Sequence, residues 1–430
     1  MSDDRVFAKC GWRLIPFMGV LYLVNFLDRL NVGFAALTMN KDLGFSPSVF
    51  GIGAGALFAG YLLFQVPLSV TMERFGARRS IFWIMAVWGL ISAGCAFVQG
   101  PLSFYVLRFL LGAAEAGFFP GVMFYLTLWF PKAYRARYSA TFVSALAYAG
   151  IIGGPLSSFI LANADGIGGL HGWQWLFLLE GLPAFLLAFV VLKLLPDRPA
   201  GAGWLSAVEK ATIAARHESE PSTGERDLGR ALRDPRLLVL SLASFAHGAA
   251  LYGPTIWLPL IVQGMGFSTF ATGFVVALPY LASAVVMILW GRSSDRSGER
   301  IWHLVCAWLL CAFGLATASF AQDYALQLVG LTLAVVGIFT AITQLMTLPP
   351  LFLRGPAAAG GIAVVNSVVS LGGVVAPPVI GLLKEQTGNY ASSMAMIALL
   401  LLLSSALVRM FVRELGSRAT VVREALQSEA

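Results

Sequence analysis

Apolar runs of about twenty residues recur along nearly the whole 430-residue chain, and they decide the solvent in which it can fold. A helix of that length spans roughly 30 Å, the thickness of the hydrocarbon layer of a bilayer. Hydrophobic residues make up 58% of the chain and charged residues only 12%. A water-soluble fold could not bury that much apolar surface. We therefore expect a protein that crosses a membrane many times.

The apolar runs are interpreted as helices, because they lack the two-residue alternation of a barrel strand. Lipid admits only helices and closed barrels, since every backbone polar group must be hydrogen-bonded internally. The sequence predicts an all-α membrane protein with twelve transmembrane helices. Their expected bounds are 14–36, 48–70, 80–99, 102–130, 138–162, 173–194, 237–262, 269–291, 301–320, 324–352, 357–382 and 391–412.

Arginine and lysine residues fall in every second connection between these helices, for example in 74–79, 132–137 and 292–300. The intervening connections hold only Lys41 and Lys384. By the positive-inside rule, this pattern places both termini and the long central connection in the cytoplasm. The net charge of +7 is therefore explained by topology, and we expect no nucleic-acid partner.

A short charged motif, acid-Arg-x-Gly-x-Arg, occurs once in each half of the chain. The copies are Glu73, Arg74, Gly76 and Arg78, and Asp295, Arg296, Gly298 and Arg300. We expect a six-helix bundle over 1–195, a cytoplasmic linker over 196–235 with an amphipathic helix near 205–217, and a second six-helix bundle with a short cytoplasmic tail over 236–430. The motif is interpreted as a cytoplasmic gating latch of charge pairs; alternatively, its charges only set the topology.

The duplicated motif and the two halves resemble the major facilitator superfamily. Further segments resemble its anion:cation symporter family, and they are 24–35 (VNFLDRLNVGFA), 129–131 (WFP) with Arg135 and Arg137, 172–183 (GWQWLFLLEGLP), 294–300 (SDRSGER) and 361–367 (GIAVVNS). The resemblance implies two pseudo-symmetric six-helix bundles. It also implies import of organic anions, such as sugar acids, tartrate or aromatic carboxylates, together with protons.

Four ionisable residues stand out inside predicted helices, where a charge costs roughly 2.5–3.5 kcal/mol. Arg108 and Glu115 share a helix face, and Gly112 between them is expected to leave room either for a neighbouring helix or for Arg108 to reach another acid, with Asp28 the obvious candidate. We interpret Asp28 and Glu115 as proton-carrying acids and Arg108 as the partner of whichever acid is ionised. Arg29 is interpreted as the group that binds the substrate carboxylate. The alternative is a charge network that only locks two helices together.

Polar side chains in other apolar spans complete the predicted substrate site. By resemblance to sugar-acid symporters, Tyr61 is expected to donate a hydrogen bond to the substrate, and Gln65 follows one turn later. The second half is expected to contribute Tyr252, Gln344, Asn366 and Ser370. Each of these residues could equally serve in packing or in contacts between helices.

The sequence departs from many sugar-acid transporters at two pairs of expected cavity residues. Leu345 and Met346 replace Phe-Trp, and Val369 and Ser370 replace Gly-Asn. The pocket becomes more apolar, which favours a less hydroxylated or an aromatic carboxylate. Glu180 is interpreted as a structural hydrogen-bonding acid, with a third coupling site as the alternative.

Other functional classes receive no support from the sequence. It lacks the motifs of zinc proteases, serine hydrolases and nucleotide-binding loops, so we expect no enzyme, no cofactor and no metal site. The competing hypothesis is a proton-coupled antiporter that exports amphipathic small molecules, which the glycines of 150–155 would fit. The two intramembrane arginines favour an anion instead. We expect a monomer in the cell membrane.

Overall fold

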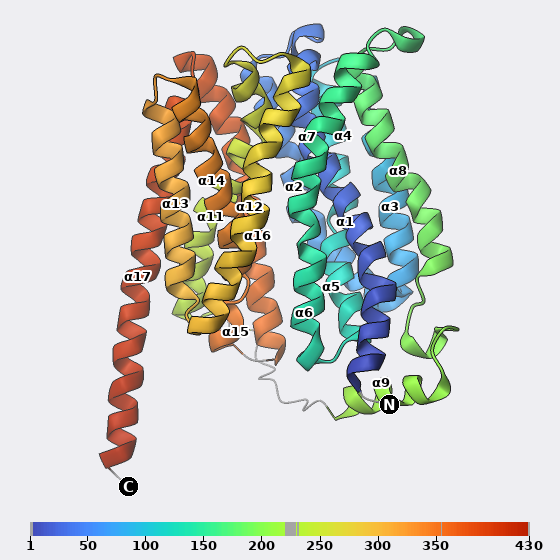
Figure 1. Cartoon of the computed structure of the whole chain (residues 1–430), viewed down its shortest axis with the longest axis vertical. Coiled ribbons are helices and arrows are strands. Elements are labelled where there is room, and N and C mark those ends of the chain that lie inside the picture. The colour runs from blue at the N-terminus through green and yellow to red at the C-terminus, as the bar shows by residue number, and fades with distance from the viewer. Residues whose placement is uncertain (1–2, 220–228, 230–231, 354, 429–430) are drawn as a thin grey trace. The chain divides into compact units, whose positions relative to one another are not determined.

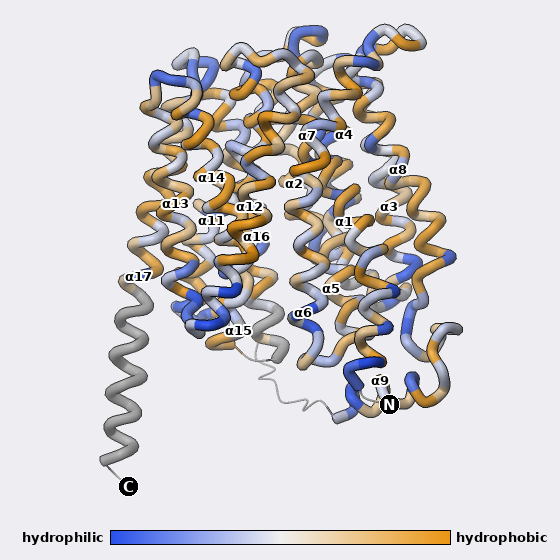
Figure 2. Tube along the Cα trace, in the orientation of Figure 1, coloured by the Kyte–Doolittle hydropathy of each residue, from blue (hydrophilic) through white to orange (hydrophobic). Residues whose placement is uncertain are grey.

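The computed structural model describes residues 3–219, 229, 232–353 and 355–428, and its regular structure there is helical throughout (Figure 1). Among these residues, 12 helices are long and apolar enough to cross a membrane. Hydrophobic residues dominate them along most of their length (Figure 2). The predicted fold class is confirmed, whereas the cytoplasmic placement of the termini stays a prediction.

Helices cover the predicted spans. They are α1 (Asp3–Asp42), α2 (Pro47–Phe75), α3 (Ala77–Gly94), α4 (Pro101–Glu115), α5 (Phe118–Trp129), α6 (Lys132–Val143), α7 (Ala145–Asn163), α8 (Gly172–Leu194), α9 (Ala207–Glu218), α11 (Pro235–Gln263), α12 (Thr269–Ser297), α13 (Ile301–Phe320), α14 (Tyr324–Leu345), α15 (Pro349–Phe352), α16 (Gly355–Thr387) and α17 (Ala391–Ser428). However, α1 begins well before its predicted bound, α17 ends well after its own, and the span expected over 324–352 divides into α14 and α15.

Some predicted spans are interrupted. The span expected over 102–130 divides into α4 and α5 around Gly117, where the missing side chain leaves the backbone free to bend. The span expected over 138–162 begins earlier and divides into α6 and α7 at Ser144. The Ser144 hydroxyl donates to the carbonyl of Thr141 at 2.7 Å, a local bond that competes with the helical ladder.

The described helices group into two compact units. The first comprises Met1–Ser222, Ile256–Leu281 and Pro377–Glu385, and the second comprises Thr223–Thr255, Ala282–Ala376 and Gln386–Ala430. Parts of α11, α12 and α16 thus belong with the N-terminal helices. The division into two six-helix bundles with a linker over 196–235 stays a prediction.

Glycines allow the added segments to pack closely inside the first unit. A Cβ atom at Gly33 of α1 would lie 2.4 Å from the carbonyl oxygen of Ile256, and one at Gly51 of α2 would lie 2.5 Å from that of Pro377. Side-chain carbons do not approach oxygen atoms so closely, so these positions require glycine. The carboxylate of Glu385 also accepts hydrogen bonds of 3.0 and 3.1 Å from the beginning of α2.

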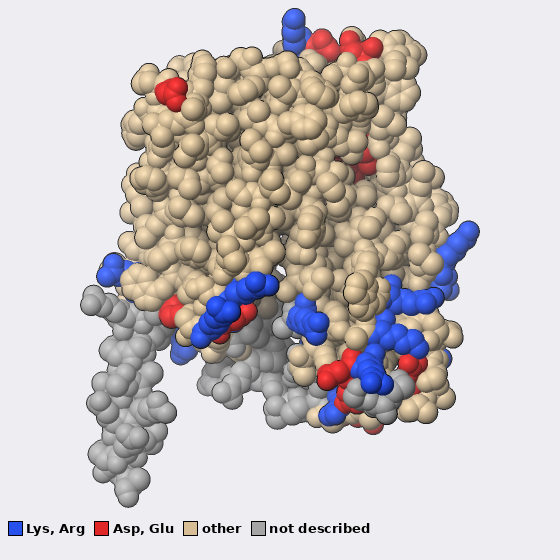
Figure 3. Space-filling model, in the orientation of Figure 1, with Lys and Arg blue, Asp and Glu red and all other residues tan. Residues whose placement is uncertain are grey.

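The connection that follows α8 packs against the N-terminal end of α1. Its helix α9 covers most of the predicted amphipathic segment. The Lys9 ammonium group lies 2.9 Å from both carboxylate oxygens of Glu209, and Trp204 stacks on Trp129 with ring centroids 5.5 Å apart. Charged side chains of both signs gather at this end of the unit (Figure 3). The connection is therefore docked on the protein by ionic and aromatic contacts.

Docking of α9 is expected to weaken in acid. The hydrogen bonds from Lys9 hold the pKa of the Glu209 carboxyl below its ordinary value. Because docking lowers this pKa, the ionised carboxyl stabilises the docked state at pH values above its ordinary pKa. This stabilisation is lost as the pH falls through the lowered pKa. Hydrogen exchange read by mass spectrometry should therefore give lower protection factors in α9 below about pH 4 than at pH 7.

The Glu209→Gln variant provides the control for this prediction. It cannot ionise, so its α9 should already be weakly protected at pH 7. Wild-type protection in this variant at pH 7 would show that the carboxylate does not hold the helix.

Candidate functional site

The intramembrane charges of α1 and α4 meet inside the first unit. Asp28, Arg108 and Glu115 are buried, with exposed fractions of 0%, 1% and 0%. The side chain of Arg29 is 11% exposed, which makes it the most accessible of the four. A solute that reaches this cluster would therefore meet Arg29 first.

Arg29 forms an ion pair with Glu115. Its Nε atom donates to Oε2 of Glu115 at 2.9 Å, and its guanidinium carbon lies 4.7 Å from the centre of the Tyr61 ring. The second oxygen of Glu115, Oε1, is buried and has no hydrogen-bond partner. In this structure the Glu115 carboxylate thus binds the Arg29 guanidinium group, which the sequence predicts to bind the substrate carboxylate.

Asp28 is held by neutral donors. The Nε1 atom of Trp88 and the hydroxyl of Ser92 each donate to its carboxylate at 2.6 Å, and Nδ2 of Asn31 donates at 3.2 Å. Several donors to one carboxylate stabilise its ionised form without a cation. Sequence reasoning missed Trp88 and Ser92, because an indole or a hydroxyl in an apolar run carries no sign of such a role.

Arg108 does not reach Asp28, contrary to the expectation from the sequence. Its Nε and Nη1 atoms are buried and have no hydrogen-bond partner. The space at Gly112 is filled by α2, because a Cβ atom there would lie 1.7 Å from the carbonyl oxygen of Leu57. The glycine thus serves close packing of α2 against α4 and opens no path for the Arg108 side chain.

The α2 residues of the predicted substrate site lie in the same unit. Tyr61 and Gln65 are 4% and 7% exposed. Tyr61 lies against the Arg29 guanidinium, and Oε1 of Gln65 is buried without a hydrogen-bond partner. Both positions therefore offer a polar group inside an apolar helix.

The remaining predicted substrate residues belong to the second unit. Oε1 of Gln344 accepts a hydrogen bond from Ser294 at 2.9 Å, and the hydroxyl of Ser370 donates to the carbonyl of Asn366 at 3.0 Å. Tyr252 lies on α11 and is partly exposed. Gln344 thus contacts α12 and Ser370 contacts its own helix, and substrate binding by all four residues stays a prediction.

The first copy of the charged motif is held by an acid from outside the motif. Gly76 takes a φ of 86° before α3, and the backbone N–H of Arg78 donates to Asp197 at 2.9 Å. Arg74 is exposed, and the side chain of Glu73 lies outside the described residues. Gly76 at the N-cap has no side chain to accept a hydrogen bond, so the Asp197 carboxylate caps the beginning of α3 instead.

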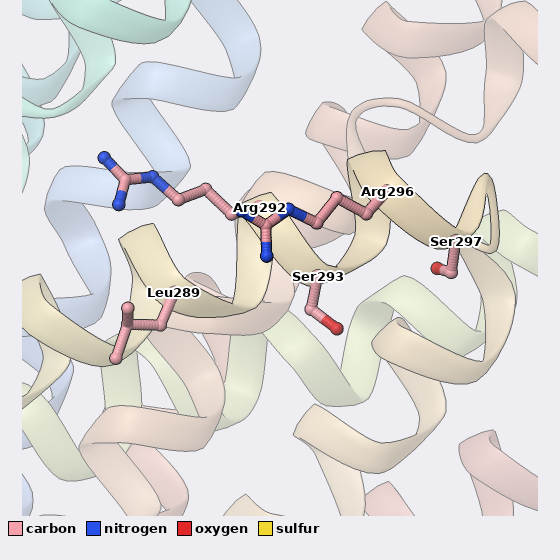
Figure 4. Close-up of a pocket in the computed structure, with 5 residues that line it drawn as sticks. All are labelled: Leu289, Arg292, Ser293, Arg296 and Ser297. Atoms are coloured by element: carbon pink, nitrogen blue, oxygen red, sulfur yellow. The ribbon is translucent and has the colours of Figure 1, made fainter.

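The second copy contains its own ion pair. Arg300 Nη2 lies 2.6 Å from Asp295, and Gly298 takes a φ of 68° at the turn. An open pocket of about 500 Å³ adjoins this copy on α12 (Figure 4). It is lined by Leu289, Arg292, Ser293, Arg296 and Ser297. Its lining holds two arginines and no acid, so the pocket is basic.

Metal binding finds no support in the part of the chain that the structure describes. No group of three or more His, Cys, Asp or Glu side chains there is arranged to hold an ion. The buried acids instead face arginine, tryptophan, serine and asparagine. This arrangement is suited to binding an anion and to holding or releasing protons.

Comparison with known proteins agrees with this geometry. The sequence profile of the Major Facilitator Superfamily matches residues 18–377. The "Putative tartrate transporter" of Agrobacterium vitis is 45% identical over 99% of this chain and 95% of its own length. The "Putative metabolite transport protein NicT" of Pseudomonas putida is 40% identical over 95% and 94%. The "Quinolone resistance transporter" of Acinetobacter baumannii is 40% identical over 93% of each chain.

Solved structures share the fold at much lower identity. A bacterial homologue of the human lysosomal transporter Spinster, in an inward-facing and occupied conformation, has a TM-score of 0.75 at 17% identity over 93% of this chain and 96% of its own. A D-xylose-proton symporter has a TM-score of 0.75 at 15% identity over 93% and 97%. These likenesses describe the arrangement of the helices alone.

Proposed function

Because the chain belongs to the major facilitator superfamily of multi-pass membrane transporters, we propose that it imports a small organic carboxylate together with protons. The substrate would pass unchanged, by alternating access between two orientations of the helices. We propose that the monomer is the working unit and that no cofactor takes part.

The observation that carries the proposal is the pair of Arg29 with Glu115. The 2.9 Å contact joins Nε of Arg29 to the Glu115 carboxylate. A substrate carboxylate can take that place only if Glu115 gives it up, and a proton on Glu115 removes its charge. The unpartnered Oε1 of Glu115 is available to receive that proton. Anion and proton therefore favour each other's binding, as a symporter requires.

Asp28 is proposed as the second proton-carrying acid. Import of an anion into a cell that is negative inside costs about 2.3 kcal/mol per charge per 100 mV. Co-transported protons offset this cost. Arg108, buried near both acids, is proposed to stabilise whichever of them is ionised through the field of its charge, without direct contact.

The relatives narrow the choice of substrate. The name of the 45% identical protein of Agrobacterium vitis points to tartrate, a small hydroxylated dicarboxylate. Arg29 and Tyr61 are proposed to hold a carboxylate, and the second unit's Tyr252, Gln344, Asn366 and Ser370 remain proposed substrate-binding residues. The apolar Met346 and Val369 favour fewer hydroxyl groups than a sugar acid carries. We therefore propose tartrate and aromatic carboxylates as the first substrates to test.

Proton-coupled export of amphipathic molecules is the second candidate. It is supported by the 40% identical protein of Acinetobacter baumannii, whose name refers to quinolone resistance. Quinolones carry a carboxylate on an aromatic frame, so Arg29 could serve this function too. The two candidates then differ in direction and in the size of the ligand.

The proposed function predicts a pH-dependent thermal shift. Purified protein in detergent is screened against tartrate, sugar acids and aromatic carboxylates at pH 5.5 and 7.5. A ligand at 100 times its Kd stabilises the folded state by about 2.7 kcal/mol, which raises the melting temperature. We expect a carboxylate to give a larger shift at pH 5.5, because protonation of Glu115 removes the charge that competes with the ligand for Arg29. Stabilisation by quinolones, without any shift from tartrate, sugar acids or small aromatic carboxylates, would favour the exporter.

A further inference from the structure

A third acid lies in the first unit, outside the proposed coupling pair. Glu180 of α8 is 4% exposed, and the hydroxyl of Ser157 on α7 donates to its Oε1 atom at 2.7 Å. Its other oxygen, Oε2, is buried and has no hydrogen-bond partner. The carboxyl group is thus satisfied on one side only.

No cation compensates Glu180 among the described residues. The groups that act on its carboxyl are Ser157, the side-chain amide of Asn31 and the carboxyl of Asp28. An ionised Glu180 would be a buried charge facing another acid, which is a costly arrangement in lipid. A proton on Oε2 removes this charge and turns the unpartnered oxygen into a donor.

Asn31 supplies the matching acceptor. Its Nδ2 atom donates to Asp28 at 3.2 Å, whereas its Oδ1 atom is buried and has no partner. The amide therefore has its nitrogen at Asp28 and its oxygen unsatisfied, and the same side chain acts on the Glu180 carboxyl. A hydrogen bond from protonated Glu180 to Oδ1 would satisfy both unpartnered atoms at once.

We infer that Glu180 is a positioning acid, which keeps its proton through the transport cycle and holds the Asn31 amide against Asp28. A fixed amide donor stabilises ionised Asp28 and so sets the pH at which Asp28 exchanges its proton. Asp28 is also faced by Arg108 and Glu115 of α4. This effect on pH rests on the proposed proton coupling, whereas the protonation of Glu180 does not.

Infrared spectroscopy tests the protonation without any substrate. The spectrum of purified wild-type protein at pH 8 should contain a carbonyl band of a protonated carboxylic acid that is absent from Glu180→Gln. Ser157→Ala should keep the band and shift its frequency, because the Ser157 hydroxyl bonds to the same carboxyl. Identical wild-type and Glu180→Gln spectra in this region would overturn the inference.

The pH profile of transport tests the positioning role. Proteoliposomes take up labelled tartrate across a range of external pH. Glutamine can accept from Ser157 and donate to Asn31, so Glu180→Gln should keep the midpoint of the wild-type profile. Glu180→Ala removes the support of Asn31 and should move the midpoint upward by about one pH unit.

The Asn31→Ala variant is the matched control. It should reproduce the midpoint of Glu180→Ala, and the double variant should move no further, because both changes remove the same contact. If Glu180→Gln shifted the midpoint as far as Glu180→Ala does, Glu180 itself would exchange a proton during transport. That result would overturn the positioning role. Wild-type uptake that does not depend on pH would instead overturn the proposed function. The infrared result would still show whether Glu180 is protonated.

Discussion

Proteoliposomes containing Glu115→Gln or Asp28→Asn are expected to lose uphill accumulation of the anion. A coupled proton multiplies the accumulation ratio by about ten for each pH unit of gradient, because one pH unit corresponds to 1.36 kcal/mol. A side chain that cannot exchange a proton removes that factor. The measurement is the steady-state ratio of internal to external labelled substrate under an inward proton gradient.

Exchange provides the control for these variants. Swapping labelled for unlabelled substrate across the membrane needs no net proton movement, so it should survive with little dependence on pH. Surviving exchange would also show that the variants are folded. Wild-type accumulation in both variants would remove Asp28 and Glu115 from the coupling mechanism.

Replacing Arg29 by lysine is expected to weaken anion binding by roughly ten- to a hundredfold in Kd. A hydrogen bond to a charged group contributes about 1.5–3 kcal/mol, and lysine lacks the fork that holds a carboxylate at two points. It also loses the flat guanidinium that lies 4.7 Å from the Tyr61 ring. Isothermal titration of the purified variant with tartrate measures the change.

The same substitution in the basic pocket is the matched control. Arg296→Lys changes an arginine in the lining of the α12 pocket and should leave the Kd unchanged. Equal affinities for wild type and Arg29→Lys would place the anion elsewhere. Weaker tartrate binding in Arg296→Lys alone would indicate that the anion binds in the α12 pocket.

Much of the fold follows from sequence patterns. The length of the apolar runs predicts the spans, because a bilayer fixes how long a crossing helix must be. The spacing of Arg108 and Glu115 places them on one face of α4, since helical geometry fixes that relation within a single element. These predictions depend on local chemistry, which a sequence records directly.

Pairing between helices is harder to predict. Whether Arg29 or Arg108 meets Glu115 depends on how α1 is rotated and shifted against α4. That geometry is set by packing such as the approach of Gly112 to Leu57 in α2. Two of the donors to Asp28, Trp88 and Ser92, come from α3, so their role also depends on tertiary packing. For the same reason, the sequence alone could not relate Glu180 of α8 to Asp28 of α1.

The glycine contacts inside the first unit bear on how fast the protein can turn over. At Gly33 and Gly51, backbone meets backbone, and beside them the centroids of the Phe50 and Trp257 rings lie 4.9 Å apart. In the proposed alternating-access cycle, surfaces that separate expose apolar area to water at a cost of about 25 cal/mol per Å². Glycines at such contacts keep the backbones closely fitted and add little apolar area of their own to that cost.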